Sequence, residues 1–493
     1  MSNAWSSLTQ RLEELQHLGG ILGLLEWDQQ TMMPSGSASL RGAQLATLSA
    51  LHHEKLTDPQ VGEWMAEVLA HSPTPTQQSA IRVLSRDYER ASRIPSQLVR
   101  SMAEARSAGF SAWGTARETK KFEDFAPALK RLVQLTREVA ACHGEAEHIY
   151  DHLLNEYDPG STTSELRPLF ERLRTELSAY VAACGEQQGP EPLNLQISKA
   201  AQMRLNQRVV DALGFRGTEG RLDRSIHPFT VGLGPQDVRL TTRVHELDPL
   251  STLGGTIHEC GHGLYEQGLP SELMNTGLCA AAGMGLHESQ SRFWENVIGR
   301  SRPFCQWLCG IIKEEWPGIG LDTNSLFRAS NRVEPSLIRV EADEATYNLH
   351  IVIRFQLEVA LLEGQLEVDS LSDAWDAAYA DVLQLQPPSP LEGVLQDVHW
   401  SSGLFGYFPS YTIGNLYAAS FRYQMESDIP DMWNQVSQGE FTTVLEWLRT
   451  HVHQKGKTMD APQIFEAAVG SRDPVADLMR HLKERSGPLY GVA

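Results

Sequence analysis

The sequence predicts a predominantly α-helical protein with a small β-sheet. Most of its 493 residues lie in runs rich in Ala, Leu, Glu and Arg, where apolar residues recur at the three- and four-residue spacing of an amphipathic helix. Only the stretch from Ile226 to Val244 shifts towards Val, Thr and Phe, which favour strands. The clearest helical runs are residues 5–24, 76–108, 126–154, 162–184, 336–364 and 371–387.

The composition narrows the class of protein. Hydrophobic residues make up 41% of the chain and charged residues 21%, which is typical of a soluble globular protein. The net charge of −20 argues against nucleic acid or an anionic membrane as a partner, because both attract basic surfaces. No apolar run approaches the roughly 18–20 residues of a membrane span. The first residues show no basic stretch followed by an apolar one, and the six cysteines follow no disulfide pattern, so we expect a cytoplasmic protein.

The stretch between Ile226 and Val244 is the predicted sheet. A Gly-Leu-Gly-Pro interruption, Gly232 to Pro235, separates two strand-like runs and indicates a β-hairpin. Strands of this kind can bind an extended peptide backbone at an exposed edge.

The pentapeptide His258-Glu259-Cys260-Gly261-His262 carries the strongest chemical signal. Residues four apart lie one turn apart on one helix face, so His258 and His262 can both reach one metal ion. Glu259 lies beside them in the general-base position of a metallohydrolase. Cys260 faces about 200° away and is expected to be a buried thiol. Glycines at 261, 263 and 268, followed by Pro270, are expected to end this helix.

A catalytic zinc ion usually takes three protein ligands, and the next helix offers two candidates for the third. Glu288 lies near the start of a run whose apolar residues (Leu286, Phe293, Trp294 and Val297) are expected to face a core. His287 is the rival ligand, about 100° round the helix. Glu288 could instead form an ordinary i,i+4 ion pair with Arg292. We favour Glu288, because two histidines and one carboxylate form a hydrolytic zinc site in known enzymes.

Motifs along almost the whole chain make the sequence resemble a known family. It is similar to the zinc metallocarboxypeptidases of the thermostable carboxypeptidase Taq type, peptidase family M32. Glu26–Pro34 and Phe405–Tyr411 also look like this family. Six motifs occur in the family's order, namely His227-Pro228-Phe229, Asp237-Val238-Arg239-Leu240-Thr241, the 258–262 pentapeptide, His287-Glu288-Ser289-Gln290, Ile338-Arg339-Val340-Glu341-Ala342-Asp343 and Gly393-Val394-Leu395-Gln396-Asp397-Val398-His399-Trp400.

The resemblance implies a helical zinc-peptidase fold with a deep substrate groove. Residues 1–493 would form one catalytic unit, in which helical subdomains could flank the groove, and the protein would be a homodimer. His258, His262 and Glu288 would bind one Zn²⁺ per chain, and Glu259 would be the catalytic acid and base. The same ligand set would also accept Co²⁺, since metal selectivity follows geometry and availability.

Recognition of a free C-terminal carboxylate calls for an arginine, whose planar fork donates two parallel hydrogen bonds. Arg339 is our first choice, although a helical pair with Asp343 competes with this role or could orient the arginine. The other candidates for substrate binding or for a hydrogen bond to the oxyanion are Arg239, His227, His399, Tyr407 and Tyr411.

These observations predict a cytoplasmic zinc carboxypeptidase that removes C-terminal residues from peptides with a free carboxylate. One alternative is a zinc oligopeptidase that cuts inside short peptides by the same chemistry. An alternative from another class is a non-catalytic helical scaffold that binds peptides. The intact Glu259 and the three candidate metal ligands argue against this last reading.

Overall fold

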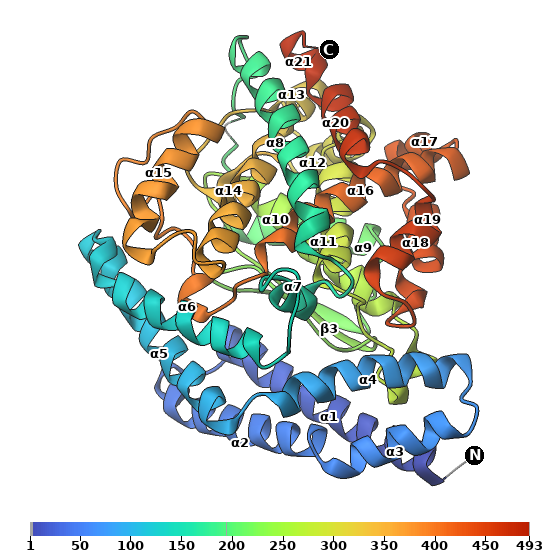
Figure 1. The fold of residues 1–493 in the computed structure, drawn as a ribbon. Coiled ribbons are helices and arrows are strands. Elements are labelled where there is room, and N and C mark those ends of the chain that lie inside the picture. The colour runs from blue at the N-terminus through green and yellow to red at the C-terminus, as the bar shows by residue number, and fades with distance from the viewer. Residues whose placement is uncertain (1–2, 194, 493) are drawn as a thin grey trace. The chain divides into compact units, whose positions relative to one another are not determined.

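A computed structural model describes residues 3–193 and 195–492 and confirms the predicted fold class, many helices and one small sheet (Figure 1). The chain divides into two compact units, each assembled from three separate segments. The first unit comprises Met1–Ser92, Pro192–Ser330 and Tyr417–Arg472, and the second comprises Arg93–Glu191, Asn331–Leu416 and Asp473–Ala493. The expectation of one catalytic unit over residues 1–493 stays a prediction.

The first unit holds the sheet and the candidate metal helix. Its N-terminal helices are α1 (Asn3–Thr31), η1 (Ser35–Ser37), α2 (Ala38–Leu56), α3 (Pro59–Ala70) and α4 (Pro75–Arg93). Its central elements are α9 (Lys199–Ala212), β1 (Gly220–Arg224), β2 (Thr230–Gly234), β3 (Asp237–Thr242), α10 (Pro249–Gly268), η3 (Ser271–Thr276), α11 (Met284–Arg292), η4 (Phe293–Ile298), α12 (Arg302–Glu315) and α13 (Thr323–Ser330). Its third segment holds α17 (Met432–Gln438), α18 (Thr442–His451), η8 (His453–Lys455) and α19 (Ala461–Val469).

The described elements of the second unit are all helices or 3₁₀ turns. Its elements are α5 (Ser96–Thr119), η2 (Phe122–Asp124), α6 (Ala126–Ala141), α7 (Asp151–Tyr157), α8 (Thr163–Gly185), η5 (Arg339–Glu341), α14 (Glu344–Leu362), η6 (Val368–Ser370), α15 (Leu371–Val382), η7 (Trp400–Ser402), α20 (Pro474–Arg485) and α21 (Gly487–Tyr490). Helix α16 (Phe408–Asp428) begins in the second unit and ends in the first.

The sheet has the strand order β1-β3-β2. Strands β2 and β3 pair antiparallel and form the predicted hairpin, with an irregularity between Gly232 and Gly234. The sequence did not predict β1, which pairs parallel to β3. A methyl group on Gly263 of α10 would lie 2.6 Å from Leu240 of β3, so this glycine allows close packing of the sheet on the helix.

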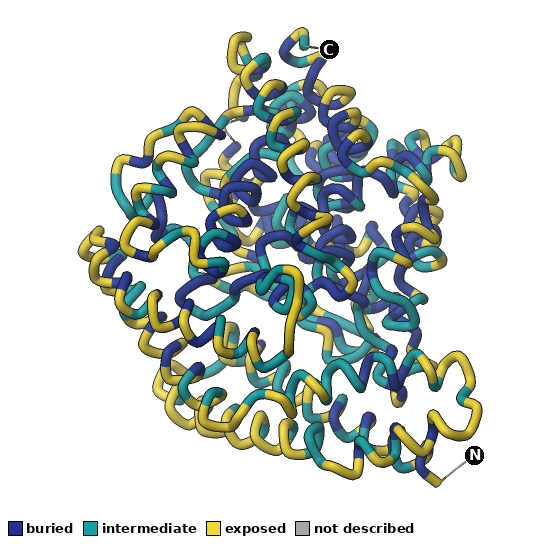
Figure 2. The backbone as a smooth tube through the Cα atoms, in the orientation of Figure 1, coloured by how far each residue is buried: buried dark blue, intermediate teal, exposed yellow. Residues whose placement is uncertain are grey.

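The helices range from fully packed to largely exposed, as Figure 2 shows by colour. Helix α14 of the second unit buries 16 of its 19 residues and is the core of that unit. Helix α2 of the first unit has no buried residue. None of the helices in the described part of the chain is long and apolar enough to cross a membrane.

Four of the predicted helical runs are interrupted or shortened in the structure. The run 76–108 is two helices, because Pro95 follows the end of α4 at Arg93. The run 126–154 is interrupted between Ala141 and Asp151, where Gly144 adopts a φ of +96°. The run 371–387 stops at Val382, before the proline pair at 387 and 388.

The fourth difference concerns the run 336–364, whose helix begins only at Glu344. The side chain of Asp343 accepts hydrogen bonds from the backbone N–H groups of Ala345 and Thr346, which makes it the N-cap of α14. Arg339 therefore lies in the preceding 3₁₀ turn. The predicted helical pair between Arg339 and Asp343 is wrong, because the capping role occupies the carboxylate.

Helix α10 also differs from expectation, because it continues through Gly261 and Gly263 and ends at Gly268. Gly261 faces α11 at very short range. A methyl group added there would lie 2.6 Å from the carbonyl oxygen of Gln290 and 2.6 Å from Cα of Ser291. This glycine is therefore a contact point between two helices rather than a helix end.

We expect the substitution Gly261→Ala to lower the free energy of unfolding by about 1–3 kcal/mol, since overpacking at a backbone contact forces the helices apart. Gly254→Ala is the matched control, because Gly254 lies on the same helix with nothing within 4 Å of an added methyl group. The control should be neutral or slightly stabilising. Denaturant unfolding of both variants measures the difference, and equal effects would contradict the proposed contact.

Candidate metal centre and active site

Three side chains of the first unit converge in the arrangement that a metal ion requires. Their ligand atoms lie within 4.8 Å of one another, and two come from α10 while the third comes from α11. Glu288 Oε2 lies 3.6 Å from Nε2 of His258 and 3.4 Å from Nε2 of His262. Donor atoms at about 2.1 Å from a tetrahedral ion lie about 3.4 Å apart. His258, His262 and Glu288 therefore fit a divalent metal ion.

His258 is held in the tautomer that a metal needs. Its Nδ1 lies 2.8 Å from Oε2 of Glu295, which accepts the Nδ1 hydrogen and leaves the Nε2 lone pair towards Glu288. Burial favours the neutral imidazole, but the carboxylates of Glu288 and Glu295 outweigh it and raise the pKa of His258. The same contacts would orient the ring towards a cation.

An arginine links the two carboxylates of α11 and η4. Arg292 Nε donates to Glu288 Oε1 at 2.7 Å, and its Nη1 donates to Glu295 Oε2 at 3.3 Å. The ion pair expected between Glu288 and Arg292 is thus present, yet Oε2 of Glu288 still faces the histidines. Burial alone would raise the pKa of both carboxyls, but Arg292 and His258 hold both pKa values well below their usual range. His262 adds to this effect at Glu288, and Arg300 adds to it at Glu295.

His262 and His287 lie against each other but have different partners. The two rings stack with their centroids 4.4 Å apart. His287 Nε2 lies 2.8 Å from Glu266 Oε1, a contact directed away from the three-residue cluster. Burial, with His287 beside it, lowers the pKa of His262 to about 3, so this imidazole is neutral at physiological pH. Glu288 therefore approaches both histidines of the pentapeptide, and His287 packs behind them.

Glu259 is buried beside the cluster, with 7% of its surface exposed. Its Oε2 accepts a hydrogen bond from Thr230 Oγ1 of β2 at 2.7 Å, which holds the carboxylate against the sheet. Burial raises the pKa of Glu259 from its ordinary value, although His258 and Thr230 oppose this shift. Cys260, on the far side of α10, is fully buried as predicted.

The helix after α11 widens into a π-helix, η4, over Phe293–Ile298. Its apolar residues Phe293, Trp294 and Val297 are buried as predicted, together with Leu286. π-Helical turns often mark functional sites, because the extra residue per turn redirects side chains. Here the turn carries Glu295, the partner of His258.

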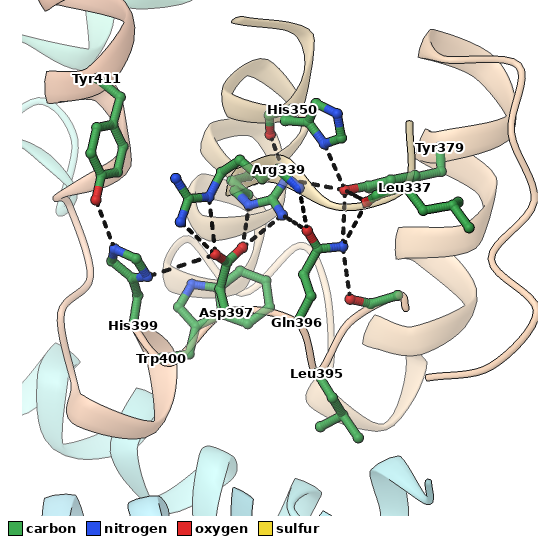
Figure 3. Close-up of polar contacts among 12 residues, drawn as sticks. Leu337, Arg339, His350, Tyr379, Leu395, Gln396, Asp397, His399, Trp400 and Tyr411 are labelled. Carbon is green, nitrogen blue, oxygen red and sulfur yellow. Dashed lines mark hydrogen bonds and ion pairs between the residues drawn. The ribbon is translucent and has the colours of Figure 1, made fainter. Parts of the chain in front are cut away.

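A second group of buried charges lies in the second unit (Figure 3). Arg339 Nε and Nη2 donate to Asp397 Oδ1 at 3.0 and 2.8 Å, and Arg354 Nη2 pairs with Asp397 Oδ2 at 2.6 Å. Arg339 Nη1 also donates to the hydroxyl of Tyr347 at 2.9 Å. Within the described residues, Asp397 is the only carboxylate paired with either arginine. Two buried cations thus share one anion.

The aromatic candidates of the second unit lie around this charge group. Figure 3 shows His399 between Tyr411, whose hydroxyl lies 3.2 Å from Nε2, and Asp397. The ring of Tyr407 lies 5.7 Å from that of His399 and 5.2 Å from that of Tyr411. Burial, with two nearby arginines, lowers the pKa of His399 to about 3. The structure thus brings together Arg339, His399, Tyr407 and Tyr411.

The remaining two candidates, His227 and Arg239, lie on the sheet of the first unit. His227 is exposed in the loop before β2, and its carbonyl accepts a hydrogen bond from Ser225. Arg239 pairs with Asp237 and lies over the ring of Trp27 of α1, 4.5 Å from its centroid. Among the described contacts, neither residue forms a hydrogen bond or ion pair with the metal cluster.

Sequence reasoning missed the partners of the candidate residues. Asp397 lies inside one of the six motifs, and Glu295 and Arg354 lie in predicted helical runs, but no local pattern assigns any of the three a role. Asp397 is 58 positions from Arg339, so no local spacing signals their pairing. The available signal was an acid two helical turns after a candidate ligand, as Glu295 is after Glu288.

The fold and the His-His-Glu cluster on adjoining helices define a metallopeptidase. A family model described as Carboxypeptidase Taq (M32) metallopeptidase matches residues 7–486. The chain is 38% identical to thermostable carboxypeptidase 1 from Thermus thermophilus, over 99% of both chains, and 35% identical to carboxypeptidase 1 from Bacillus subtilis, over 97% of both. It therefore belongs to the M32 metallocarboxypeptidase family and is a peptide hydrolase of the exopeptidase class.

Solved structures agree with this assignment. The M32 carboxypeptidase from Deinococcus radiodurans superimposes with a TM-score of 0.97 at 37% identity and covers 100% of both chains. The Pyrococcus furiosus carboxypeptidase superimposes with a TM-score of 0.95 at 32% identity, over 98% of this chain and 99% of that one.

We expect Glu295→Gln to weaken metal binding by about 10–100-fold, because loss of a partner that orients a ligating histidine has effects of this size. Competition with a fluorescent zinc chelator measures the affinity directly. Glu314→Gln is the control, since Glu314 is an exposed acid of the same unit paired with Arg208. An unchanged affinity in Glu295→Gln would show that Glu295 does not support the metal site.

Proposed function

We propose that the protein is a zinc-dependent carboxypeptidase in which Glu259 is the general acid and base. The observation that carries the proposal is the convergence of His258, His262 and Glu288, whose spacing suits a tetrahedral ion, beside the buried carboxylate of Glu259. Two histidines and one glutamate form a hydrolytic zinc site in known enzymes. When bound, the ion supplies Lewis acidity and lowers the pKa of a water molecule from 15.7 to about 7.

The protein's own groups would then move the protons. Glu259 accepts a proton from the attacking water and delivers it to the nitrogen of the departing amino acid. A buried carboxylate whose pKa is raised suits both roles, because it holds a proton more readily than an exposed one. Thr230 keeps the carboxylate in place through its 2.7 Å hydrogen bond.

Arg339 is the proposed receptor for the C-terminal carboxylate of the peptide. The charge group of Arg339, Arg354 and Asp397 holds two buried cations and one anion, so a second anion would balance it. Guanidinium has five N–H donors, and Arg339 uses three of them towards Asp397 and Tyr347. Arg354 is fully buried, which leaves Arg339 as the better candidate.

The other candidates would bind the rest of the substrate. His399, Tyr407 and Tyr411 offer hydrogen-bond groups near Arg339, and one of them could donate to the oxyanion. His227 and Arg239 would contribute from the sheet, which could pair with an extended peptide. We further propose a cytoplasmic location, in agreement with the six free cysteines, and a metal site that also accepts Co²⁺. The family resemblance suggests a homodimer.

The main rival is an oligopeptidase that cuts inside peptides with the same zinc chemistry. Mass spectrometry of one peptide as free acid and as C-terminal amide, with zinc-loaded and chelator-treated protein, separates the two. A ladder of single-residue losses from the free acid alone, abolished by chelation, supports the proposal. Internal cleavage of both forms would favour the oligopeptidase, and bound peptide without cleavage would favour a scaffold.

We expect Glu259→Gln to retain the metal and to lose nearly all turnover, because the amide cannot accept the proton of water. Metal content by atomic absorption and kcat on a short peptide measure the two effects. Glu288→Ala should lose the metal instead. If His287→Ala loses the metal and Glu288→Ala keeps it, the proposed ligand set is wrong.

We expect Arg339→Ala to raise KM for free-acid peptides far more than for amidated peptides of the same sequence. The ratio of the two KM values is the readout, since general destabilisation would affect both substrates alike. Arg172→Ala, at an exposed arginine of the same unit, is the control. A ratio unchanged from the parent protein would rule out Arg339 as the carboxylate receptor.

A further inference from the structure

One buried acid of the second unit has no part in the chemistry described so far. Glu358 lies on α14 and is fully buried. Within the described residues it forms no ion pair, unlike Asp397 nearby in the same unit. Burying an unpaired carboxylate is costly, so its retention calls for a specific set of contacts.

Glu358 accepts three hydrogen bonds. Its Oε1 accepts from the indole Nε1 of Trp400 at 2.7 Å. Its Oε2 accepts from the hydroxyl of Tyr150 at 2.6 Å and from the backbone N–H of Gly406 at 3.1 Å. An indole and a backbone N–H can only donate, so a group with two accepting oxygens is required here.

Two of these donors lie at the ends of one turn. Trp400 follows His399 directly, and Gly406 precedes Tyr407 directly. Figure 3 shows that His399, beside Trp400, points towards Tyr411 and Asp397. Gly406 has a φ of +89°, and a methyl group there would lie 2.8 Å from the backbone carbon of Leu153, so the turn cannot shift freely.

We propose that Glu358 is a positioning residue that holds the turn from His399 to Tyr407 in its substrate-binding conformation. A single carboxylate bonds both ends of the turn and ties them to α14 and to Tyr150. The inference rests on the proposed function, in which His399 and Tyr407 bind the peptide.

The ionisation of Glu358 provides a readout of this contact. The ionisable groups that face it are Tyr150 and Tyr157 beside α7 and Arg354 one turn earlier on α14. Burial raises the pKa of Glu358 to about 7, so the carboxyl titrates near neutral pH. Because the unfolded chain has the lower pKa, this group's contribution to stability falls as pH rises from about 4.5 to 7.

The hydrogen bond between Trp400 and Glu358 is tested on the folded protein by NMR, through the indole N–H resonance of Trp400. This resonance is assigned as the one that is missing from the spectrum of Trp400→Phe. We expect this resonance to shift with a midpoint near pH 7 in the parent protein and in Glu363→Gln, a control at the C-cap of the same helix. It should lose that titration in Glu358→Gln. If the chemical shift of this resonance changes neither with pH nor on the substitution Glu358→Gln, the proposal is overturned.

The functional consequence is tested by a double-mutant cycle. Glu358→Gln should lower kcat/KM by about tenfold, mainly through KM, whereas Glu363→Gln should leave it unchanged. In a His399→Ala background, Glu358→Gln should cost less than about twofold, because the group that it positions is already gone. Equal losses in both backgrounds would mean a merely structural role and would overturn the proposal.

Two further measurements distinguish failure of this proposal from misfolding of the variant and from failure of the proposed function. If Glu358→Gln does not fold, Trp400→Phe replaces it in the cycle, since it removes one donor and leaves the carboxylate. If the losses of kcat/KM in Trp400→Phe and His399→Ala are then additive in the double variant, the proposal is overturned. An inactive parent protein loaded with zinc would contradict the proposed function instead, and the indole signal would still show whether Glu358 holds the turn.

Discussion

The contact between α10 and α11 at Gly261 is the constraint on which the metal centre depends. Two ligands lie on one helix and the third lies on the other, so the separation of the helices sets the distances from Glu288 to both histidines. Metal–ligand bonds tolerate deviations of only about 0.2 Å. The sequence pattern suggests that Gly261 ends its helix. In the structure this glycine lies inside α10 and allows α10 and α11 to approach closely enough for all three ligands to reach one ion.

The two buried charge groups have opposite compositions, and each suits a different ligand. The group in the first unit, around Glu288, Glu295 and Glu259, is rich in carboxylates, as a cation site must be. The group in the second unit has more guanidinium than carboxylate. In both, a residue of the opposite charge, Arg292 or Asp397, holds the functional groups in place.

The local parts of the site could be predicted from the sequence, because helical spacing places His258 and His262 on one face wherever the helix lies. Spacing alone could not separate Glu288 from His287, since that depends on the rotation of α11 against α10, and the preference for Glu288 rested on the ligand chemistry of known zinc sites. Strand β1 was missed because Gly220–Arg224 is short and mostly polar, without an alternating pattern. The alternative pair of Arg339 with Asp343 does not form, because Asp343 caps α14, and the observed partner, Asp397, is too distant in sequence for local spacing to indicate it.

The path of the backbone determines when the first unit can finish folding. It passes between the two units five times, and the first unit is complete only when residues 417–472 have joined it. From this last segment, His453 contacts Gln290 at 2.8 Å, two residues from Glu288, and Asp460 pairs with Arg82 and Arg86 near the other end of the sequence. A growing chain therefore lacks part of the packing around its metal ligands until residues 417–472 have been made.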